Sequence, residues 1–263
     1  MRLATWNVNS LKARLGRVTA WLEGTGTDVL CLQETKLADA AFPAGAFAER
    51  GYASAHHGNG QWNGVAILSR VGLEDPRPGF SGELVEEVEQ CRILAARCGG
   101  IEVVSVYVPN GRSVGSEHFE AKLAWLERLR ADLAPRCAGG GDLVVCGDFN
   151  IAPEDRDVFD PAQLVGATHV TPAEREALGR LLDCGLVDVA RRLHPDGPGP
   201  FTWWDYRGGA FHKGEGMRID LALCTTGLAG RVRRAEVDRE ARKRSTGEGS
   251  PSDHAPLVLE LDD

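Results

Sequence analysis

Polar clusters follow several short apolar runs of the chain, and their side chains are mostly carboxylates and carboxamides. The six clusters cover residues 6–10, 31–36, 107–111, 147–150, 218–221 and 252–256. A single cluster of this kind is typical of a turn. If one sheet edge gathers all six, however, four carboxylates, at least two carboxamides and one histidine converge. So much negative charge in one place requires a cation or shifted pKa values.

The ligand types in these clusters favour a hard metal ion. Carboxylate and amide oxygens are hard donors, and neither a cysteine pair nor a set of histidines accompanies them. Magnesium, or manganese in its place, is therefore favoured over zinc and copper. Magnesium typically takes one or two carboxylates and leaves room for a substrate phosphate. The predicted chemistry is metal-assisted hydrolysis of a phosphoester.

His254 is the candidate acid or base of this chemistry. Asp220 could orient its imidazole, as a carboxylate does in a hydrolytic triad. The alternative is that His254, which directly follows Asp253, only satisfies a turn. No G-x-S-x-G motif supplies a nucleophile, so water is the expected attacking group.

The composition is that of a globular protein with an acidic balance. The 263 residues include 30 Lys and Arg against 38 Asp and Glu, which gives a net charge of −8. This charge disfavours a passive nucleic-acid binder, but it leaves room for an enzyme with a local basic track and an acidic metal site.

Seven widely spaced cysteines without a C-x-x-C pair indicate a reducing compartment. The first residues lack an apolar signal core, and no apolar run approaches ~18 residues. We therefore expect a cytoplasmic protein with no membrane contact.

Strands and helices are expected to be mixed along the whole chain. Apolar runs predict strands at 28–32, 64–68, 103–108, 143–146, 219–223 and 257–261. Helical spacing predicts three helices. The first is capped by Ser10 and ended by Gly24 and Gly26, and the second is capped by Ser116 and has an apolar stripe from Phe119 to Leu133. The third begins at the capping box of Thr171 and Glu174 and ends near Gly185. The charged segment 239–251 is expected to be an exposed loop.

No linker divides the chain, so residues 1–263 are predicted to form one α/β domain with two sheets and helices outside. A doubly wound parallel sheet is the alternative, but no Gly-rich phosphate loop follows the first strand.

The ordered motifs closely resemble those of the exonuclease III family of apurinic/apyrimidinic (AP) endonucleases, within the endonuclease/exonuclease/phosphatase superfamily. They are W-N-V-N-S at 6–10, L-Q-E-T-K at 32–36, Y-V-P-N-G at 107–111, G-D-F-N at 147–150, W-W-D-Y-R at 203–207, R-I-D-L at 218–221 and S-D-H-A-P at 252–256. They span essentially the whole chain, and the fifth and sixth motifs point to the DNA-repair branch.

The resemblance implies a four-layer α/β sandwich, in which two mixed sheets pack face to face with helices outside. It implies Mg²⁺, with Mn²⁺ as a substitute, held by Glu34 with contributions from Asn7, Asn9, Asp148, Asn150 and Asp253. The implied catalytic residues are Tyr107, Asp148, Asn150, Asp220 and His254. The implied substrate contacts are Asn110, Arg112 and an apolar pocket for the base-free sugar formed by Trp203, Met217 and Ile219.

The implied activity is incision of double-stranded DNA 5′ to abasic sites, with 3′→5′ removal of nucleotides or blocking groups, by a monomer. Candidate cationic contacts to DNA are Arg112, Lys122, Arg207 and Lys213. The segment 231–244, with seven basic residues against three acidic, is either a further contact or a solvated surface.

Three alternatives stay open. The protein could be chiefly a 3′→5′ exonuclease, because the loop 153–171 carries Thr168 and His169 where some relatives place asparagines. It could be another phosphoesterase of the superfamily, such as one acting on inositol phosphates or sphingolipids, or a non-catalytic DNA- or protein-binding member.

Overall fold

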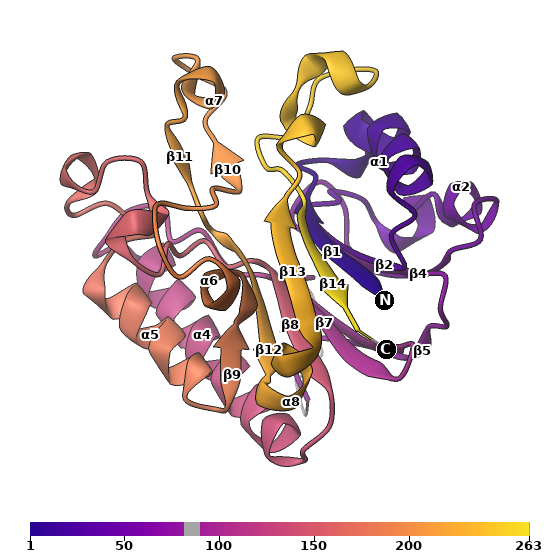
Figure 1. Cartoon of the computed structure of the whole chain (residues 1–263), viewed down its shortest axis with the longest axis horizontal. Helices are drawn as coiled ribbons and strands as arrows, with labels where there is room; N and C mark the ends of the chain where they lie inside the picture. Colours follow the sequence, from indigo (N-terminus) through magenta and orange to yellow (C-terminus); the bar gives the residue numbers. More distant parts are fainter. Residues whose placement is uncertain (82–89, 263) are drawn as a thin grey trace.

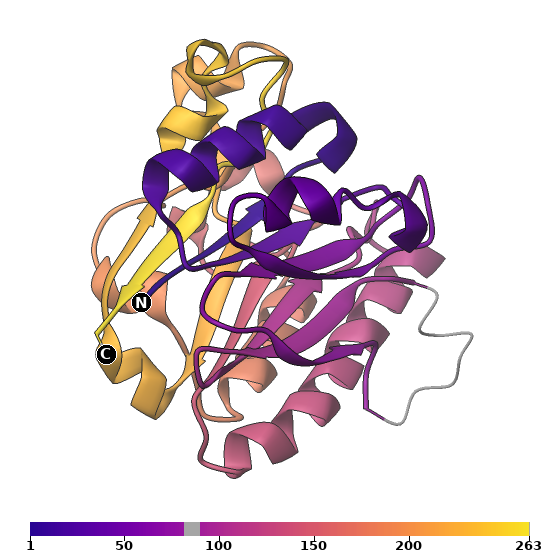
Figure 2. The ribbon, with the colours of Figure 1, turned by 90° about the vertical axis from the view of Figure 1, so that its right-hand side faces the viewer.

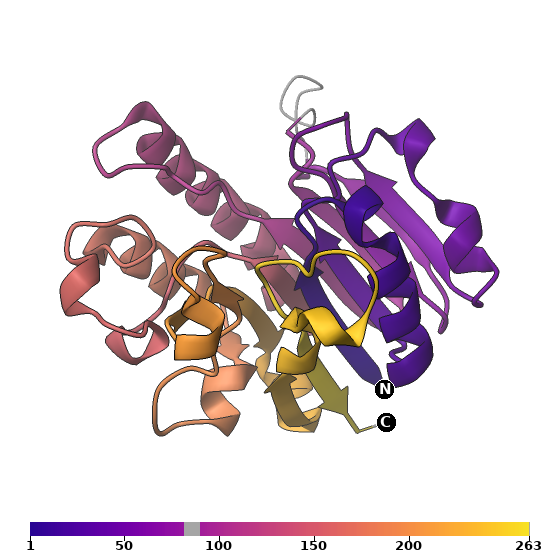
Figure 3. The same ribbon diagram turned by 90° about the horizontal axis from the view of Figure 1, so that it is seen from above.

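The computed structural model describes residues 1–81 and 90–262. Two mixed six-stranded sheets pack face to face, and helices cover their outer faces (Figure 1). This arrangement confirms the predicted four-layer α/β sandwich and excludes a single doubly wound sheet. Seen from above, the helices of the two outer layers lie on opposite sides of the paired sheets (Figure 3).

The first sheet joins both ends of the chain. Its strand order is β13 (Val232–Val237), β14 (Leu257–Leu261), β1 (Arg2–Asn7), β2 (Val29–Gln33), β4 (Val65–Ser69) and β3 (Ala53–His57). β1 pairs antiparallel with β14 and parallel with β2. The parallel pair requires a crossover, which α1 (Leu11–Thr25) supplies. The pairing of the first strand with the last supports the proposal that residues 1–263 fold as one domain.

The second sheet is built from the middle of the chain. Its order is β5 (Glu74–Pro78), β6 (Ile93–Cys98), β7 (Ile101–Tyr107), β8 (Leu143–Asp148), β12 (Asp220–Thr225) and β9 (Leu186–Asp188). β7 and β8 are parallel and are joined through α4 (Glu117–Ala138). A separate ribbon pairs β10 (Trp203–Trp204) with β11 (Gly216–Met217).

Three apolar layers hold the sandwich together. The central layer packs residues of both sheets, among them Val29, Ile67, Val103 and Cys146. One outer layer places α1 and α2 (Ala44–Ala48) on the first sheet (Figure 2). The other places α4 and α5 (Pro172–Leu182) on the second sheet. The remaining short helices are α6 (Val189–Leu193), α7 (Ala210–Lys213), α8 (Thr226–Arg231) and the 3₁₀ turns Asp39–Ala41, Asp155–Asp157, Ala162–Leu164, Arg239–Arg242 and Arg244–Thr246.

Two of the three predicted helix caps are confirmed. The Ser116 side chain accepts a hydrogen bond from the Phe119 backbone, and Thr171 and Glu174 form a reciprocal capping box. Ser10 precedes α1, but its side chain caps nothing. Its backbone has φ of 89° and its N–H donates to the Glu34 carbonyl at 2.7 Å. The turn that carries Glu34 therefore determines the conformation at this position.

The segment 239–251 is less exposed than the sequence suggests. Arg17 of α1 is buried, and its guanidinium donates to the carbonyls of Lys243, Gly247 and Gly249. Arg242, which belongs to the same segment, is also buried. Since one side chain satisfies several carbonyls, the segment has a defined shape despite its loop-like composition.

Within residues 1–81 and 90–262, no helix combines the length and the apolar character that crossing a membrane requires.

Candidate active site

The predicted site residues meet at one end of the sandwich, and both sheets contribute. Asn7 ends β1 and Glu34 follows β2 in the first sheet. Tyr107 and Asp148 end β7 and β8 in the second sheet, and Asp220 lies directly opposite Asp148 in the antiparallel pair of β8 and β12. The cluster therefore forms where the two facing sheets end together, and not at the edge of a single sheet.

The backbone at this end is constrained. Asn9, Glu34 and Asn150 have φ of 42°, 51° and 51°, which is a left-handed region that side chains rarely adopt. Gly147 has φ of 151°, and a Cβ there would lie 1.9 Å from the Val106 carbonyl oxygen. Strained residues of this kind cluster at functional sites, where the surrounding fold holds them. This close approach explains why glycine is the first residue of the G-D-F-N motif.

Asn7 holds two carboxylates together. Its Nδ2 donates to Glu34 Oε1 at 2.8 Å and to Asp148 Oδ2 at 2.9 Å, while its Oδ1 accepts from the Asn9 backbone N–H. Because that N–H can only donate, the orientation of the amide is fixed. The Asn7 nitrogen faces both carboxylates, so this orientation disfavours the predicted metal coordination by Asn7 and favours a positioning role.

His254 and Asp220 form a buried pair. Asp220 Oδ2 lies 2.8 Å from His254 Nδ1, and His254 Nε2 lies 3.8 Å from Asp148 Oδ2. Burial lowers the pKa of His254, but Asp220, Asp148 and Asp253 outweigh it and raise the pKa to about 10. The imidazole is therefore protonated at neutral pH and presents its Nε2–H toward Asp148.

Asp148 is a buried acid whose pKa is raised. Burial raises its pKa to about 7; Asp220 and Glu34 act in the same direction, whereas His254 and the Asn7 amide oppose it. A carboxyl group with a pKa near the operating pH is suited to proton transfer. Two ionisable groups, the Asp148 carboxyl and the His254 imidazole, thus lie 3.8 Å apart.

The oxygens of Glu34 and Asn9 already surround a positive charge. Lys36 Nζ lies 2.9 Å from Glu34 Oε2 and 2.6 Å from Asn9 Oδ1. Asn9 Nδ2 donates to Asp253 Oδ1 at 3.1 Å, and Asp253 Oδ2 accepts from Trp203 Nε1 at 3.1 Å. This oxygen-rich donor set suits a hard cation, and the residues present therefore fit the predicted metal ion. Lys36 had no assigned role in the sequence analysis, although it stands two residues after Glu34.

Asp148, Asp220 and His254 form a candidate acidic/histidine metal site, because one ligand atom of each lies within 4.8 Å of the others. Asp220 Oδ1 is buried without a hydrogen-bond partner among the described residues. The hydrogen bond between Asp220 Oδ2 and His254 Nδ1 occupies one ring nitrogen, so we treat these two residues as a hydrogen-bonded pair.

Two asparagines and a tyrosine complete the wall of the site. Asn110 Nδ2 donates to Asn150 Oδ1 at 3.1 Å, and Asn150 Nδ2 donates to the Val108 carbonyl at 3.0 Å. Burial raises the pKa of Tyr107 well above its usual value, and Glu34 and Asp148 raise it further. The tyrosine hydroxyl remains protonated and is available as a donor. Arg92, which the sequence analysis missed, stacks over the Tyr107 ring at 4.7 Å.

The residues of the predicted sugar pocket lie together. Met217 and Ile219 are buried, and partly buried Trp203 packs against the same cluster with Ala152 and Val158. Trp204, in contrast, is fully buried against Phe211 and belongs to the core. The hydrogen bond from Trp203 to Asp253 places this apolar cluster directly beside the polar site.

The candidate DNA contacts divide into exposed and buried side chains. Arg112 and Arg207 lie in loops and Lys213 ends α7, and all three are exposed and can reach a ligand. Lys122 is fully buried, so the prediction that it contacts DNA is wrong. Its Nζ forms an ion pair with Glu174 and donates to the Asn150 carbonyl at 2.7 Å and the Asn110 carbonyl at 3.3 Å. The helical position of Lys122 faces inward, and its charge supports the backbone of both site asparagines.

Lys122→Met is expected to lower the free energy of unfolding by about 3–5 kcal/mol, because it leaves the buried Glu174 carboxylate without its cation. Urea unfolding followed by circular dichroism measures this loss. The matched control is Arg180→Met, which breaks an exposed ion pair with Glu176 on α5 and should change the free energy by no more than ~0.5 kcal/mol. Equal effects of the two substitutions would contradict the assigned role of Lys122.

A protein of this fold, with an acid–base pair and an oxygen-rich cation site at the ends of two facing sheets, belongs to the class of phosphoester hydrolases. A model described as the Endonuclease/Exonuclease/phosphatase family matches residues 4–254. The chain belongs to this family.

Relatives and solved structures agree with this assignment. The chain is 33% identical over 272 residues to exodeoxyribonuclease III of Haemophilus influenzae, with 99% of this chain and 100% of the relative covered. It superposes with a TM-score of 0.94 and 38% identity on the 3′ phosphatase NExo from Neisseria bound to a product DNA hairpin, over 100% of both chains. The same values describe its similarity to an AP endonuclease from Archaeoglobus fulgidus. The resemblance to the exonuclease III family and the prediction of a nuclease-type hydrolase are confirmed.

Proposed function

We propose that this protein is a DNA repair nuclease that cleaves the phosphodiester 5′ to abasic sites and removes nucleotides or blocking groups from 3′ ends of duplex DNA. The observation that carries the proposal is the placement of His254, hydrogen-bonded to Asp220, within 3.8 Å of Asp148 in the same cluster as Glu34. The relatives named above are an exodeoxyribonuclease, a 3′ phosphatase bound to a DNA hairpin and an AP endonuclease, and each matches this chain over its full length. We propose that it acts as a monomer, and its seven free cysteines support a reducing compartment such as the cytoplasm.

Glu34, Asn9, Asp148 and Asp253 are the residues that would hold a divalent ion, for which we propose Mg²⁺, with Mn²⁺ as a substitute. When bound, such an ion polarises the phosphoryl oxygens and offsets the charge that develops on them. Asn150, also predicted as a ligand, directs its Oδ1 to Asn110, and we assign it with Asn110 and Tyr107 to binding the phosphate.

We propose that Asp148 is the general base and that His254 stabilises charge on the phosphate. Asp148 accepts a proton from the attacking water at its carboxylate as the water oxygen bonds to phosphorus. The bond from phosphorus to the 3′ oxygen of the leaving strand breaks, and that oxygen takes up a proton from solvent. The positively charged His254 stabilises the phosphate through Nε2–H. Asp220 holds the imidazole at Nδ1, fixes its orientation and stabilises its charge. The Trp203, Met217 and Ile219 cluster is apolar, so we propose that it accepts a sugar that lacks a base and excludes an intact nucleotide by its size.

A missing base lowers the cost of turning a nucleotide out of the duplex, which agrees with this choice of substrate. The test is cleavage of three substrates by the purified protein with magnesium: a duplex with an internal abasic site, a duplex with a blocked 3′ end, and an inositol phosphate. We expect cleavage of both duplexes and none of the inositol phosphate. Cleavage of the inositol phosphate alone would assign the protein to another branch of the family.

His169 is expected to influence the balance between internal incision and trimming of 3′ ends. Its Nδ1 lies 2.6 Å from the Asn150 carbonyl and its Nε2 lies 3.5 Å from Asn110 Nδ2. The ring therefore occupies space beside the two asparagines that we assign to the phosphate. His169→Gly should increase internal abasic incision relative to 3′-end trimming, as measured on the two duplexes above. An unchanged ratio would show that His169 has no part in substrate choice.

A further inference from the structure

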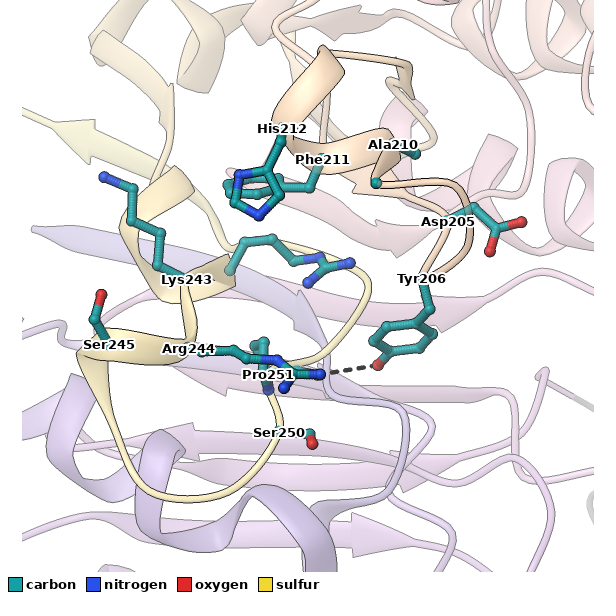
Figure 4. Close-up of a pocket in the computed structure, with 12 residues that line it drawn as sticks. Asp205, Tyr206, Ala210, Phe211, His212, Lys243, Arg244, Ser245, Ser250 and Pro251 are labelled. Atoms are coloured by element: carbon teal, nitrogen blue, oxygen red, sulfur yellow. Dashed lines mark hydrogen bonds between the residues drawn. The ribbon is translucent and has the colours of Figure 1, made fainter.

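A cavity of about 590 Å³ lies outside the site described above, between the connection from β10 to β11 and the segment 242–251 (Figure 4). Its volume is within the range of small-molecule sites in proteins. Tyr206, Phe211 and His212 approach from one side, and Arg244 extends toward Tyr206 from the other (Figure 4). The cavity thus has an aromatic wall that faces a basic one.

Arg242 lines this cavity and is a buried cation that forms no ion pair with a described residue, although Asp253 is close enough to oppose the lowering of its pKa by burial. Its side chain is only 8% exposed, and no carboxylate of the described residues forms an ion pair with it. The guanidinium lies 5.0 Å from the Tyr206 ring and 5.3 Å from the Phe211 ring, and Nη2 donates to the Trp204 carbonyl at 3.3 Å. Its Nε is buried without a hydrogen-bond partner in the described chain. A buried guanidinium that lacks an anion is costly, so this one favours an anionic ligand nearby.

The other charged groups at the cavity leave an excess of positive charge. Arg244 makes no ion pair with any described residue, and Lys243 pairs with Glu240 at 2.5 Å. His212 is exposed at the opposite wall. Asp205 is the acid that lines the cavity; it is exposed and accepts a hydrogen bond from the Arg207 backbone. One exposed carboxylate cannot neutralise Arg242 and Arg244 together.

The cavity is joined directly to the proposed active site. Tyr206 donates its hydroxyl hydrogen to the Pro251 carbonyl at 3.0 Å, and Trp204 donates its backbone N–H to the Asp253 carbonyl. Asp253 is one of the proposed ion ligands and precedes His254. A strand whose reacting phosphate lies at His254 can therefore continue over the loop that ends at Pro251 and reach the cavity.

We propose that this cavity is a second phosphate site, in which Arg242 and Arg244 bind a nucleotide phosphate while Tyr206 and Phe211 contact its sugar or base. Aromatic side chains bind nucleotides in this way without sequence preference. The phosphate comes either from the DNA backbone beyond the cleaved bond or from a free mononucleotide released by the enzyme. The inference rests on the proposed function, since it takes the ligand to be a nucleotide.

The test measures binding and not cleavage. Affinity of the full chain for a fluorescent abasic duplex is followed by anisotropy over a range of salt concentrations, with a chelator to prevent hydrolysis. Each phosphate contact contributes ~0.9 to the slope of log K against log salt on duplex DNA. Arg244→Gln should lower that slope by ~0.9. The control Arg130→Gln removes an exposed charge on α4, which pairs with Glu127, and should leave the slope unchanged.

A second arm identifies the source of the phosphate. Calorimetry measures binding of deoxyadenosine 5′-monophosphate to the wild type, to Arg244→Gln and to Arg242→Met, each checked for its native circular dichroism spectrum. A lower salt slope without mononucleotide binding supports the backbone phosphate. Mononucleotide binding that Arg244→Gln weakens at least tenfold supports the free nucleotide.

An unchanged slope together with no mononucleotide binding, or with binding that Arg244→Gln leaves unaltered, would overturn the proposal. Because Arg244 is exposed, this result does not depend on whether Arg242→Met folds. Failure of the wild type to cleave DNA would instead refute the proposed function, and the binding data would still report on the cavity.

Discussion

Replacing His254 by alanine should reduce kcat on an abasic duplex by about 10²–10⁴-fold, which corresponds to ~3–5 kcal/mol of barrier. The reason is geometric, because His254 Nε2 lies 3.8 Å from Asp148 Oδ2 and its Nδ1 is held by Asp220. The substitution removes the cation that stabilises the phosphate. Single-turnover cleavage of the abasic duplex at saturating enzyme measures the chemical step without product release.

Asp220→Asn separates the charge of the pair from the imidazole itself. The amide keeps the size of the side chain but no longer holds the His254 pKa near 10, since Asp220 is the main group that raises it against the effect of burial. We expect a smaller loss than for His254→Ala, together with activity that falls with rising pH at a lower pH than in the wild type, because His254 would lose its proton below pH 10. His118→Ala, an exposed histidine on α4, is the control.

Activity of His254→Ala within tenfold of the wild type would show that the pair is structural.

The second large effect concerns the metal ion. Excess chelator should abolish cleavage, and magnesium or manganese should restore it. Glu34→Gln should raise the magnesium concentration for half-maximal activity by more than the ~10–100-fold that is typical for loss of an outer partner of a metal ligand. The substitution keeps the hydrogen-bonding shape of the side chain but removes the charge that Asn7 and Lys36 now contact.

Glu23→Gln provides the matched control for this experiment. Glu23 lies on α1 and pairs with Arg50 at the surface, so its loss should leave the magnesium requirement unchanged. Direct binding of manganese, measured by its paramagnetic effect on water relaxation, should weaken in Glu34→Gln in parallel with activity. Full cleavage by the wild type in excess chelator would refute a metal-dependent mechanism.

Local sequence patterns determine much of the fold. The run 257–261 coincides with β14, and the runs at 28–32 and 64–68 are each within one residue of β2 and β4. The caps at Ser116 and Thr171 form as predicted, because a side-chain oxygen three residues before a free N–H is a local relationship. Ser10 has the same residue type but no capping role, since its backbone is held by the Glu34 turn of another strand. Capping therefore fails where a long-range contact constrains the backbone.

The sequence by itself determined the chemistry of the donors, the order of the elements and the family, because these depend on residue type and spacing. Only the tertiary structure decided that the Asn7 nitrogen faces Glu34 and Asp148, and that Lys122 points inward to Glu174. It also placed Arg242, from a segment expected to be an exposed loop, beneath two aromatic rings. The physical reason is that the direction and burial of a side chain depend on partners distant in the sequence. For a charged group those partners determine whether it is solvated, forms an ion pair, or is buried without an ion pair and favours binding of a ligand.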